Sequence, residues 1–160
     1  ESIPPEIPTT KPVVRPALIS DFEKILALIE VFPHQDHRQD KDKLHSVFAE
    51  ILADKRLNML VAECEGQLVS TCTLAIIPNL TRRGRPYGLI EVVATLAPFR
   101  RRGFGSAVLN AALETAWRQN CYKVMLQSGK LNLQAHEFYK AIGFVDSKLG
   151  FSAEPPVSDL

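Results

Sequence analysis

The chain contains a turn whose residue types are suited to holding anions. It reads Arg100-Arg101-Arg102-Gly103-Phe104-Gly105 and stands between an apolar run and an amphipathic segment. Glycines let backbone N–H groups approach a ligand, and the first turn of a helix has four N–H groups without intrahelical partners. The helix dipole adds roughly half a positive charge at that end. The turn therefore predicts a phosphate site, best matched to two linked phosphates, and the alternative is an ordinary turn with solvated arginines.

Two other side chains could move a proton. Glu91 is the one carboxylate in the apolar run Leu89–Thr95, and loss of hydration there would make it a better base. The alternative is a glutamate that faces solvent or pairs with an arginine. Tyr139 stands among residues with helical spacing, where it is either a proton donor or a packed tyrosine.

These side chains need a strand and two helices to position them. Leu89–Thr95 is apolar on both alternating faces, which predicts a central strand buried on both sides. After the turn, apolar residues at helical spacing predict an amphipathic helix, and they are Leu109, Ala112, Leu113 and Ala116. A shorter helix is predicted from Asn132 to Ile142, with Asn132 as its cap and Gly143 in the left-handed turn that ends it.

The rest of the chain shows further strand and helix patterns. Strands are expected at Val13–Ala17, Asn58–Cys64, Gln67–Ile77, Cys121–Ser128 and Phe144–Phe151, where the last segment holds one strand or two. Helices are expected from Ser20 or Asp21 through Phe32 and from Leu44 to Ala53. Glu65-Gly66 is typical of a tight hairpin turn. Helices that cross between strands predict a mixed α/β sheet.

The composition is that of one globular domain. The chain has 160 residues, of which 46% are hydrophobic and 23% are charged. We expect residues 13–151 to form the domain, between a proline-rich tail at 1–12 and a second tail at 152–160. No apolar run reaches the roughly 18 residues that cross a bilayer, so no membrane association is expected.

Charge and cysteine content narrow the partners. The formal net charge of +1 argues against nucleic-acid binding by bulk charge, although basic residues gather in the stretch 82–85 and in the turn. The cysteines, Cys64, Cys72 and Cys121, lack metal-ligand spacing. They are interpreted as buried thiols in a reducing compartment, which predicts a cytoplasmic location.

His34 and His37 stand at spacing i, i+3 in a polar stretch between the first two predicted helices. They are solvated histidines, acceptor contacts or metal ligands. The lack of a third ligand nearby argues against the last interpretation, so no metal site is predicted.

Two motifs resemble those of a known family. Arg100-x-x-Gly103-x-Gly105 after a buried strand resembles the acyl-CoA pyrophosphate loop of the GNAT superfamily of N-acetyltransferases. The pattern Asn132-x-x-Ala135-x-x-Phe138-Tyr139-x-x-x-Gly143-Phe144 resembles the segment that carries the catalytic tyrosine in that family. Both occur in the expected order, so the resemblance covers residues 13–150. One departure is Pro98, which many members place one position earlier.

The resemblance implies a fold and a branch. The fold would be α/β, with a mixed, mostly antiparallel sheet of six or seven strands, about four helices, and a splay between central strands 4 and 5. The run that contains Glu91 and the segment Cys121–Leu126 look most similar to the glucosamine-phosphate N-acetyltransferase branch, where the strand carboxylate lies beside the acceptor amine. Val92 stands where that branch has an acidic residue.

The resemblance also implies which residues bind acetyl-CoA. The pyrophosphate would be held by Arg100, Arg101, Arg102, Gly103, Phe104, Gly105 and Ser106. Arg101 or Arg102 would reach a further phosphate of the coenzyme. Backbone N–H groups of Val93, Ala94 and Thr95 would pair with the pantetheine arm and polarise the thioester carbonyl. Asn132 would contact the pantetheine or cap its helix.

The chemistry implied by the resemblance needs a base and an acid. Glu91 would take a proton from the acceptor amine, directly or through a water, and Tyr139 would protonate or hydrogen-bond the departing thiolate. The connection that contains His34 and His37 would form part of the acceptor pocket.

The sequence therefore predicts an N-acetyltransferase that moves an acetyl group from acetyl-CoA to a primary amine of a small molecule, such as an amino sugar or its phosphate. The amine would attack directly in a ternary complex, without a metal, in a protein that forms homodimers as relatives commonly do. Three alternatives stay open: a protein or peptide acceptor, a CoA-sensing module without turnover, and nucleic-acid binding through the arginine clusters.

Overall fold

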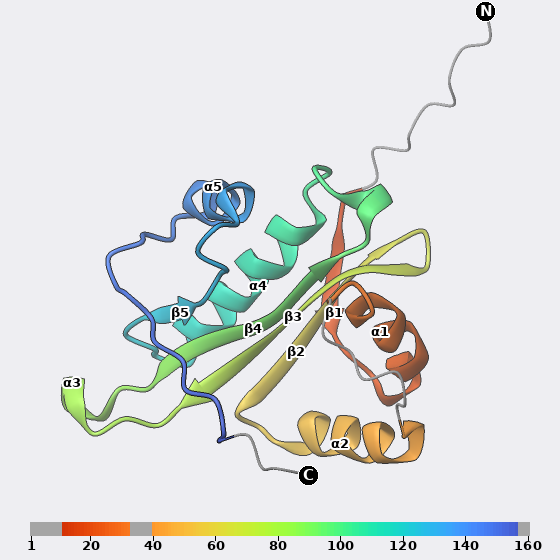
Figure 1. Cartoon of the computed structure of the whole chain (residues 1–160). Helices are drawn as coiled ribbons and strands as arrows, with labels where there is room; N and C mark the ends of the chain where they lie inside the picture. The colour runs from red at the N-terminus through yellow and green to blue at the C-terminus, as the bar shows by residue number, and fades with distance from the viewer. Residues whose placement is uncertain (1–10, 33–39, 157–160) are drawn as a thin grey trace, which may run out of the picture. The chain divides into compact units, whose positions relative to one another are not determined.

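The strands of the structure form one sheet with the order β1-β2-β3-β4-β5 (Figure 1). Its strands are β1 (Val13–Pro16), β2 (Leu57–Cys64), β3 (Gln67–Ile77), β4 (Tyr87–Thr95) and β5 (Val124–Leu126). The first four pair antiparallel, and β5 pairs parallel to β4. The computed structural model describes residues 11–32 and 40–156.

The helices follow the predicted order. They are α1 (Phe22–Ile29), α2 (Lys41–Ala53), α4 (Phe104–Arg118) and α5 (Leu133–Ile142), with short 3-10 turns η1 (Ile19–Asp21) and η2 (Ala97–Phe99). A further short element, α3 (Thr81–Gly84), contains Arg82 and Arg83 at φ 54° and 61°. Because these are left-handed backbone angles, α3 is a turn in the β3–β4 loop and not a regular helix.

The chain divides into two compact units, the first ending at Leu126 and the second beginning at Gln127. The first unit holds the sheet and helices α1 to α4. The second holds α5, which begins after Asn132, whose side chain accepts a hydrogen bond from the N–H of Ala135. Gly143 ends α5 at φ 115°, so both predicted ends of this helix are confirmed.

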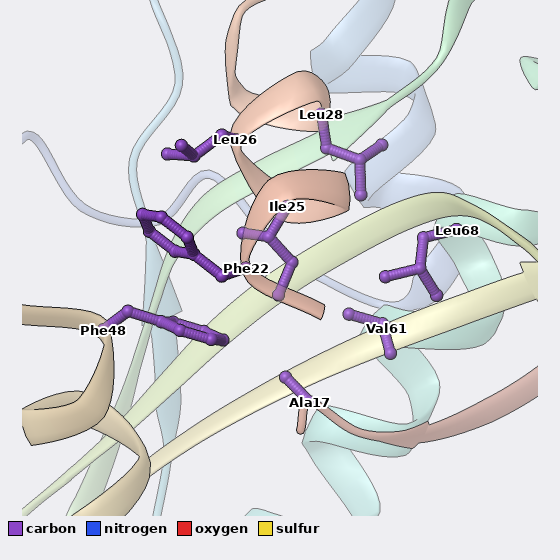
Figure 2. Close-up of a cluster of buried hydrophobic side chains, with 8 residues drawn as sticks. All are labelled: Ala17, Phe22, Ile25, Leu26, Leu28, Phe48, Val61 and Leu68. Carbon is purple, nitrogen blue, oxygen red and sulfur yellow. The ribbon is translucent and has the colours of Figure 1, made fainter. Parts of the chain in front are cut away.

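One face of the sheet packs against α1 and α2. Phe22 and Leu28 of α1 gather with Val61 of β2, Leu68 of β3 and Phe48 of α2 in one buried cluster (Figure 2). The ring centres of Phe22 and Phe48 lie 5.7 Å apart. Burial of each large side chain contributes about 1.5–3 kcal/mol, which holds both helices on this face.

The opposite face packs against α4. The buried side of the helix consists of Phe104, Val108, Leu109, Ala112 and Ala116, which confirms the predicted amphipathic helix. The Cys72 thiol of β3 donates to the carbonyl of Val108 at 3.6 Å. Burial raises the pKa of the Cys72 thiol to about 12, so this cysteine stays protonated and is no nucleophile. Side chains of a strand alternate between faces, which places Thr71 and Thr73 on the α1 side.

An ion-pair network ties β1 to β2 and to the start of α1. Arg15 donates to both carboxylate oxygens of Asp21, at 2.7 and 3.0 Å, and to Glu63 at 2.7 Å. Asp21 is only 4% exposed and also accepts from the N–H of Leu18. The Arg15 guanidinium holds the pKa of Asp21 below its usual range. Asp21 occupies the predicted cap position of α1, but its oxygens bind Arg15 and Leu18 instead of the helix N–H groups.

The prediction of six or seven strands is wrong for the described residues, which form five. The segment Phe144–Phe151 has no strand pairing, and Val145, Leu149 and Phe151 are 78%, 75% and 86% exposed. Alternating apolar residues form a strand only where a second strand supplies hydrogen bonds, and this segment has none in the described part of the chain.

The predicted strand Cys121–Ser128 is shorter than expected and begins at Val124. Arg85 donates to the carbonyls of Asn120 and Cys121, both at 3.2 Å. The chain before β5 is therefore bound to the β3–β4 loop. The hairpin turn at Glu65-Gly66 is confirmed, with φ of 50° and 79°.

Candidate active site

A β-bulge interrupts β4 beside the predicted catalytic glutamate. Glu91 pairs with Thr73 of β3, and Ala94 pairs with Thr71. Between these two pairs, β4 has two residues, Val92 and Val93, where β3 has only Cys72. Val92 has φ 54°, which is unusual for a β-branched side chain. Bulges of this kind bend a strand and redirect its backbone groups, and they are frequent next to active sites.

The edge of β4 is open after the bulge. The pairing of β4 with β5 ends at Ile90 and Leu126, so the described residues give Glu91–Thr95 no strand neighbour on that side. This matches the predicted splay between strands 4 and 5. An open strand edge offers unpaired N–H and C=O groups to a ligand that lies along it.

The backbone directions identify the groups that face this edge. The N–H of Leu96 donates to β3 at 2.9 Å, and the carbonyl of Ala94 accepts from a β3 hydroxyl at 3.0 Å. Because neighbouring residues of a strand point their hydrogen-bonding groups in opposite directions, Val93 and Thr95 point theirs to the open edge. The carbonyl of Thr95 accepts from Arg100 Nε at 3.2 Å.

The chain enters α4 through the predicted anion turn. Arg101 has φ 60° and Gly103 has φ 86°, and α4 starts at Phe104. No side chain caps this end of the helix, and its first backbone bond runs from Ala107 N to Gly103 O at 3.0 Å. The N–H groups of residues 104–106 are therefore without partners in the described chain, as the first turn of a helix requires.

The arginines of this turn differ in their surroundings. Arg102 lies against two phenylalanine rings, with its guanidinium carbon 5.1 Å from the centre of Phe99 and 5.6 Å from that of Phe104. The two rings meet edge to face at 5.9 Å. Arg101 is exposed. The sequence reasoning missed Phe99, although aromatic residues on both sides of the arginines were a usable signal.

The charge around the turn suits a diphosphate. No aspartate or glutamate occurs in residues 92–113, so neither the arginines nor the helix dipole is neutralised within this segment. Free backbone N–H groups, guanidinium groups and a left-handed glycine are the donors that bind phosphate at helix N-termini. The residues present therefore fit the pyrophosphate of a nucleotide coenzyme such as CoA.

Glu91 is exposed, so the expectation of a carboxylate buried in an apolar strand is wrong. Glu91 continues the alternation of burial along β4, in which Gly88 and Ile90 are buried while Leu89 on the other face is only half-buried. Its pairing with Thr73 places Glu91 on the α1 face of the sheet, together with Leu89.

Asn132 and Tyr139 belong to the second unit. Tyr139 is half-buried, with its ring 5.3 Å from Phe138 and 6.1 Å from Phe144 in an edge contact. Asn132 Oδ1 accepts from Ala135 N at 3.2 Å, so its oxygen serves as a helix cap. The two alternatives given for Asn132 are compatible, because its amide nitrogen has no bond recorded in the described chain.

His34 and His37 lie outside the described residues. In the described ranges, no three or more His, Cys, Asp or Glu side chains come together around a common metal position. The same ranges contain no helix with the length and hydropathy of a membrane span.

The sequence pattern of the acetyltransferase (GNAT) family matches residues 19–144. The chain belongs to this family. Membership confirms the predicted fold class and the predicted class of enzyme, and the match runs from the start of α1 to the end of α5. The fold agrees with a solved chain titled "Putative acetyltransferase" from Agrobacterium tumefaciens that is 42% identical, with a TM-score of 0.85 over 89% of this chain and 99% of that one.

The GNAT relatives differ in the acceptor that their names give. The glucosamine 6-phosphate N-acetyltransferase of Trypanosoma brucei is 37% identical over 49% of this chain and 52% of its own length. An N-alpha-acetyltransferase of Sulfurisphaera tokodaii is 26% identical over 85% of this chain and 81% of its own length. The chain thus matches about half the length of the trypanosome enzyme, and the names agree on acetyl transfer but not on the acceptor.

Proposed function

We propose that this protein transfers an acetyl group from acetyl-CoA to a primary amine. The observation that carries the proposal is the continuity of the open β4 edge with the uncapped start of α4. The start of α4 offers N–H groups to a diphosphate, and the β4 edge offers N–H and C=O groups to an amide-containing arm, so a ligand that joins these two parts matches the site. Acetyl-CoA has this construction, and it supplies the activated acetyl group as a thioester.

In this proposal each residue of the site has a role that its position supports. The amides of residues 104–106 and the arginines Arg100 to Arg102 hold the diphosphate, and Gly103 keeps a side chain away from it. The N–H groups of Val93 and Thr95 face the open edge, where they orient the pantetheine arm and stabilise negative charge on the thioester oxygen. Ala94 was predicted to pair with the pantetheine arm as well, but its hydrogen-bonding groups face β3, so it fixes β4 to β3 instead.

Glu91 accepts the proton of the attacking amine in this proposal. Its exposure favours a route through an intervening water, because the carboxylate is accessible to solvent. Tyr139 protonates the thiolate as it leaves. Asn132 donates its free amide N–H to the pantetheine arm while its oxygen caps α5.

The leading acceptor is a small primary amine, such as an amino sugar or its phosphate, with support from the trypanosome relative. The second candidate is a peptide, with support from the relatives named N-alpha-acetyltransferases. His34 and His37 are proposed acceptor contacts. The proposal also includes a homodimer and a single domain at residues 13–151. It further includes a cytoplasmic location, with which the free cysteines among the described residues are consistent.

Acetyl transfer to a panel of amines tests this function. The assay follows thiol release from acetyl-CoA and the mass of each product, with CoA affinity measured in parallel by calorimetry. We expect Glu91→Gln to lower kcat/KM about 10- to 100-fold with CoA affinity unchanged. Tight CoA binding without transfer to any amine would favour the CoA-sensing alternative.

A further inference from the structure

A second basic cluster stands at the start of β4, far along the strand from the anion turn. We call it the loop patch, and it consists of Arg82, Arg83, Arg85, Tyr87, Tyr122 and Lys123. The two segments that form it, residues 67–90 and 115–126, contain no aspartate or glutamate. The patch is therefore a local concentration of positive charge in a chain whose net charge is only +1.

The cations of the loop patch are gathered on aromatic rings. The Lys123 ammonium lies 5.4 Å from the ring centres of both Tyr87 and Tyr122, and the Arg82 guanidinium carbon lies 5.5 Å from Tyr122. A cation over a ring is held in place without losing its charge. In the described chain these two cations and Arg83 have no ion-pair partner, so the patch keeps its capacity for an anion.

The loop that carries the arginines is fastened in an unfavourable backbone conformation. Arg82, Arg83 and Gly84 have φ of 54°, 61° and 75°, and left-handed angles are disfavoured for residues with a side chain. Asn79 Nδ2 donates to the carbonyl of Arg85 at 3.3 Å and to the hydroxyl of Thr81 at 2.8 Å. These bonds hold the loop in this conformation before any ligand binds, so the basic side chains are preorganised.

Strand β4 runs from the loop patch to the proposed catalytic residue, Glu91. Tyr87, Leu89 and Glu91 share one face of β4, since side chains alternate along a strand and the bulge begins only after Glu91. Both Tyr87 and Leu89 are half-buried, whereas Gly88 and Ile90 on the other face are buried. Glu91 lies four residue steps along the strand from Tyr87, which corresponds to about 13 Å.

We propose that the loop patch binds an anionic group of the acceptor, while the acceptor's amine lies at Glu91. The inference rests on the proposed function and adds the acceptor's chemical class: a primary amine joined to a phosphate or carboxylate about 13 Å away. An elongated phosphorylated amine and a peptide with an acidic side chain a few residues after its amine share this chemistry. A compact amino sugar phosphate is too short to fill both positions, so among the primary amines proposed above the inference favours an elongated acceptor over an amino sugar phosphate.

Acceptors of graded length test the inference directly. We would measure kcat/KM for ω-aminoalkyl phosphates of increasing chain length and for the matching amino alcohols. The expected result is a preference for the phosphate that peaks at least 10-fold near the 13 Å span. This preference for the phosphate should fall at least fivefold in Lys123→Gln and in Arg83→Gln. The Arg83 side chain makes no hydrogen bond, ion pair or ring contact within the described chain. Equal kcat/KM for phosphate and alcohol at every length would overturn the inference.

Peptides and sugars distinguish the two sources of the anion. We would compare peptides that carry a single aspartate at each position from 2 to 6. If position 4 or 5 is preferred and Lys123→Gln removes the preference, the acceptor is an acidic peptide. A preference confined to long amino phosphates identifies a small molecule. If glucosamine 6-phosphate is preferred over glucosamine and Lys123→Gln leaves that preference intact, the anion binds elsewhere and the inference is wrong.

Arg118→Gln is the matched control. Arg118 is an exposed arginine at the end of α4 whose recorded contact is a 3.4 Å bond to the Thr115 hydroxyl, and its loss should leave the phosphate preference unchanged. An enzyme that acetylates amines without any phosphate preference refutes this inference and keeps the proposed function. A chain that binds CoA and acetylates nothing refutes both.

Discussion

The two ends of β4 carry similar residues in different backbones. At one end Arg100–Gly103 runs directly into α4, whose first N–H groups have no partner in the described chain. At the other end Thr81–Arg85 forms an isolated turn, where the carbonyl of Arg82 already accepts from Arg85 N at 3.3 Å. An arginine cluster therefore forms a diphosphate site only when a helix start supplies converging amides; without one, it offers a charged surface.

The largest expected effect concerns a residue outside both regions. Tyr139→Phe should lower kcat about 100-fold, because it removes the proposed proton donor to the thiolate. CoA affinity should stay within about twofold, since the anion turn is untouched. Stopped-flow turnover together with calorimetry separates the two parameters. A fully active variant would remove the acid role from Tyr139 and leave the comparison between the ends of β4 standing.

Two glycines allow a direct test of that comparison. Gly103 and Gly84 have φ of 86° and 75°, and an added Cβ would meet nothing within 4 Å at either position. Valine is therefore strained to a similar degree at both. Gly103→Val should weaken CoA binding about 10-fold or more, because its side chain occupies the approach to the helix amides. Gly84→Val should leave CoA affinity unchanged, and equal losses in the two variants would contradict the assignment of the diphosphate to the anion turn.

Two arginines on aromatic rings provide a smaller test. Arg102 lies over Phe99 and Phe104, and Arg82 lies over Tyr122. Arg102→Gln should weaken CoA binding about fivefold, with a shallower salt dependence, because one charge near the phosphates is lost. Arg82→Gln should leave both the affinity and its salt dependence as they are. The measurement is CoA affinity at several ionic strengths, and a reversed pattern would move the coenzyme to the other end of β4.

The Arg15–Asp21 ion pair should contribute to the stability of the fold and not to CoA binding. The pKa of Asp21 is lowered by Arg15, so the unfolded chain takes up the proton first as the pH falls. The pair therefore stabilises the fold above about pH 4 and loses its contribution as the pH drops through the lower folded-state pKa of Asp21. Asp21→Asn should cost about 2 kcal/mol at neutral pH and almost nothing in strong acid.

Urea unfolding of Asp21→Asn and the parent chain between pH 2 and pH 7 checks this dependence. A difference that grows toward acid would contradict the pairing. CoA affinity at pH 7 serves as the functional control, and we expect it to be unchanged because the Arg15 network lies on β1, β2 and η1, outside the proposed coenzyme site.

Local patterns in the sequence were sufficient for much of the fold. The apolar spacing of Leu109, Ala112 and Ala116 predicted α4, and Asn132 and Gly143 marked both ends of α5, because caps and helical periodicity depend on neighbours within a few residues. Strand pairing depends on distant partners. The segment Phe144–Phe151 has strand-like alternation but no partner in the described chain, so its prediction was wrong.

The candidate site was predictable in its motifs and not in its geometry. The turn at Arg100–Gly105 follows from residue types alone. The bulge at Val92 does not, because valine is a poor choice for φ 54° and only the register with β3 reveals the extra residue. Glu91 is exposed because its face of β4, which also carries the half-buried Leu89, is only partly covered, and the residue types in LIEVVAT do not show how far each face is covered.

Backbone amide shifts of the ¹⁵N-labelled protein, recorded during a titration with CoA, test the central claim most directly. The account predicts that the largest saturable shifts occur at Gly103, Gly105 and Ser106, with smaller shifts at Val93 and Thr95. Arg83 and Gly84 should not move. Large shifts in the β3–β4 loop with an unaffected start of α4 would contradict it.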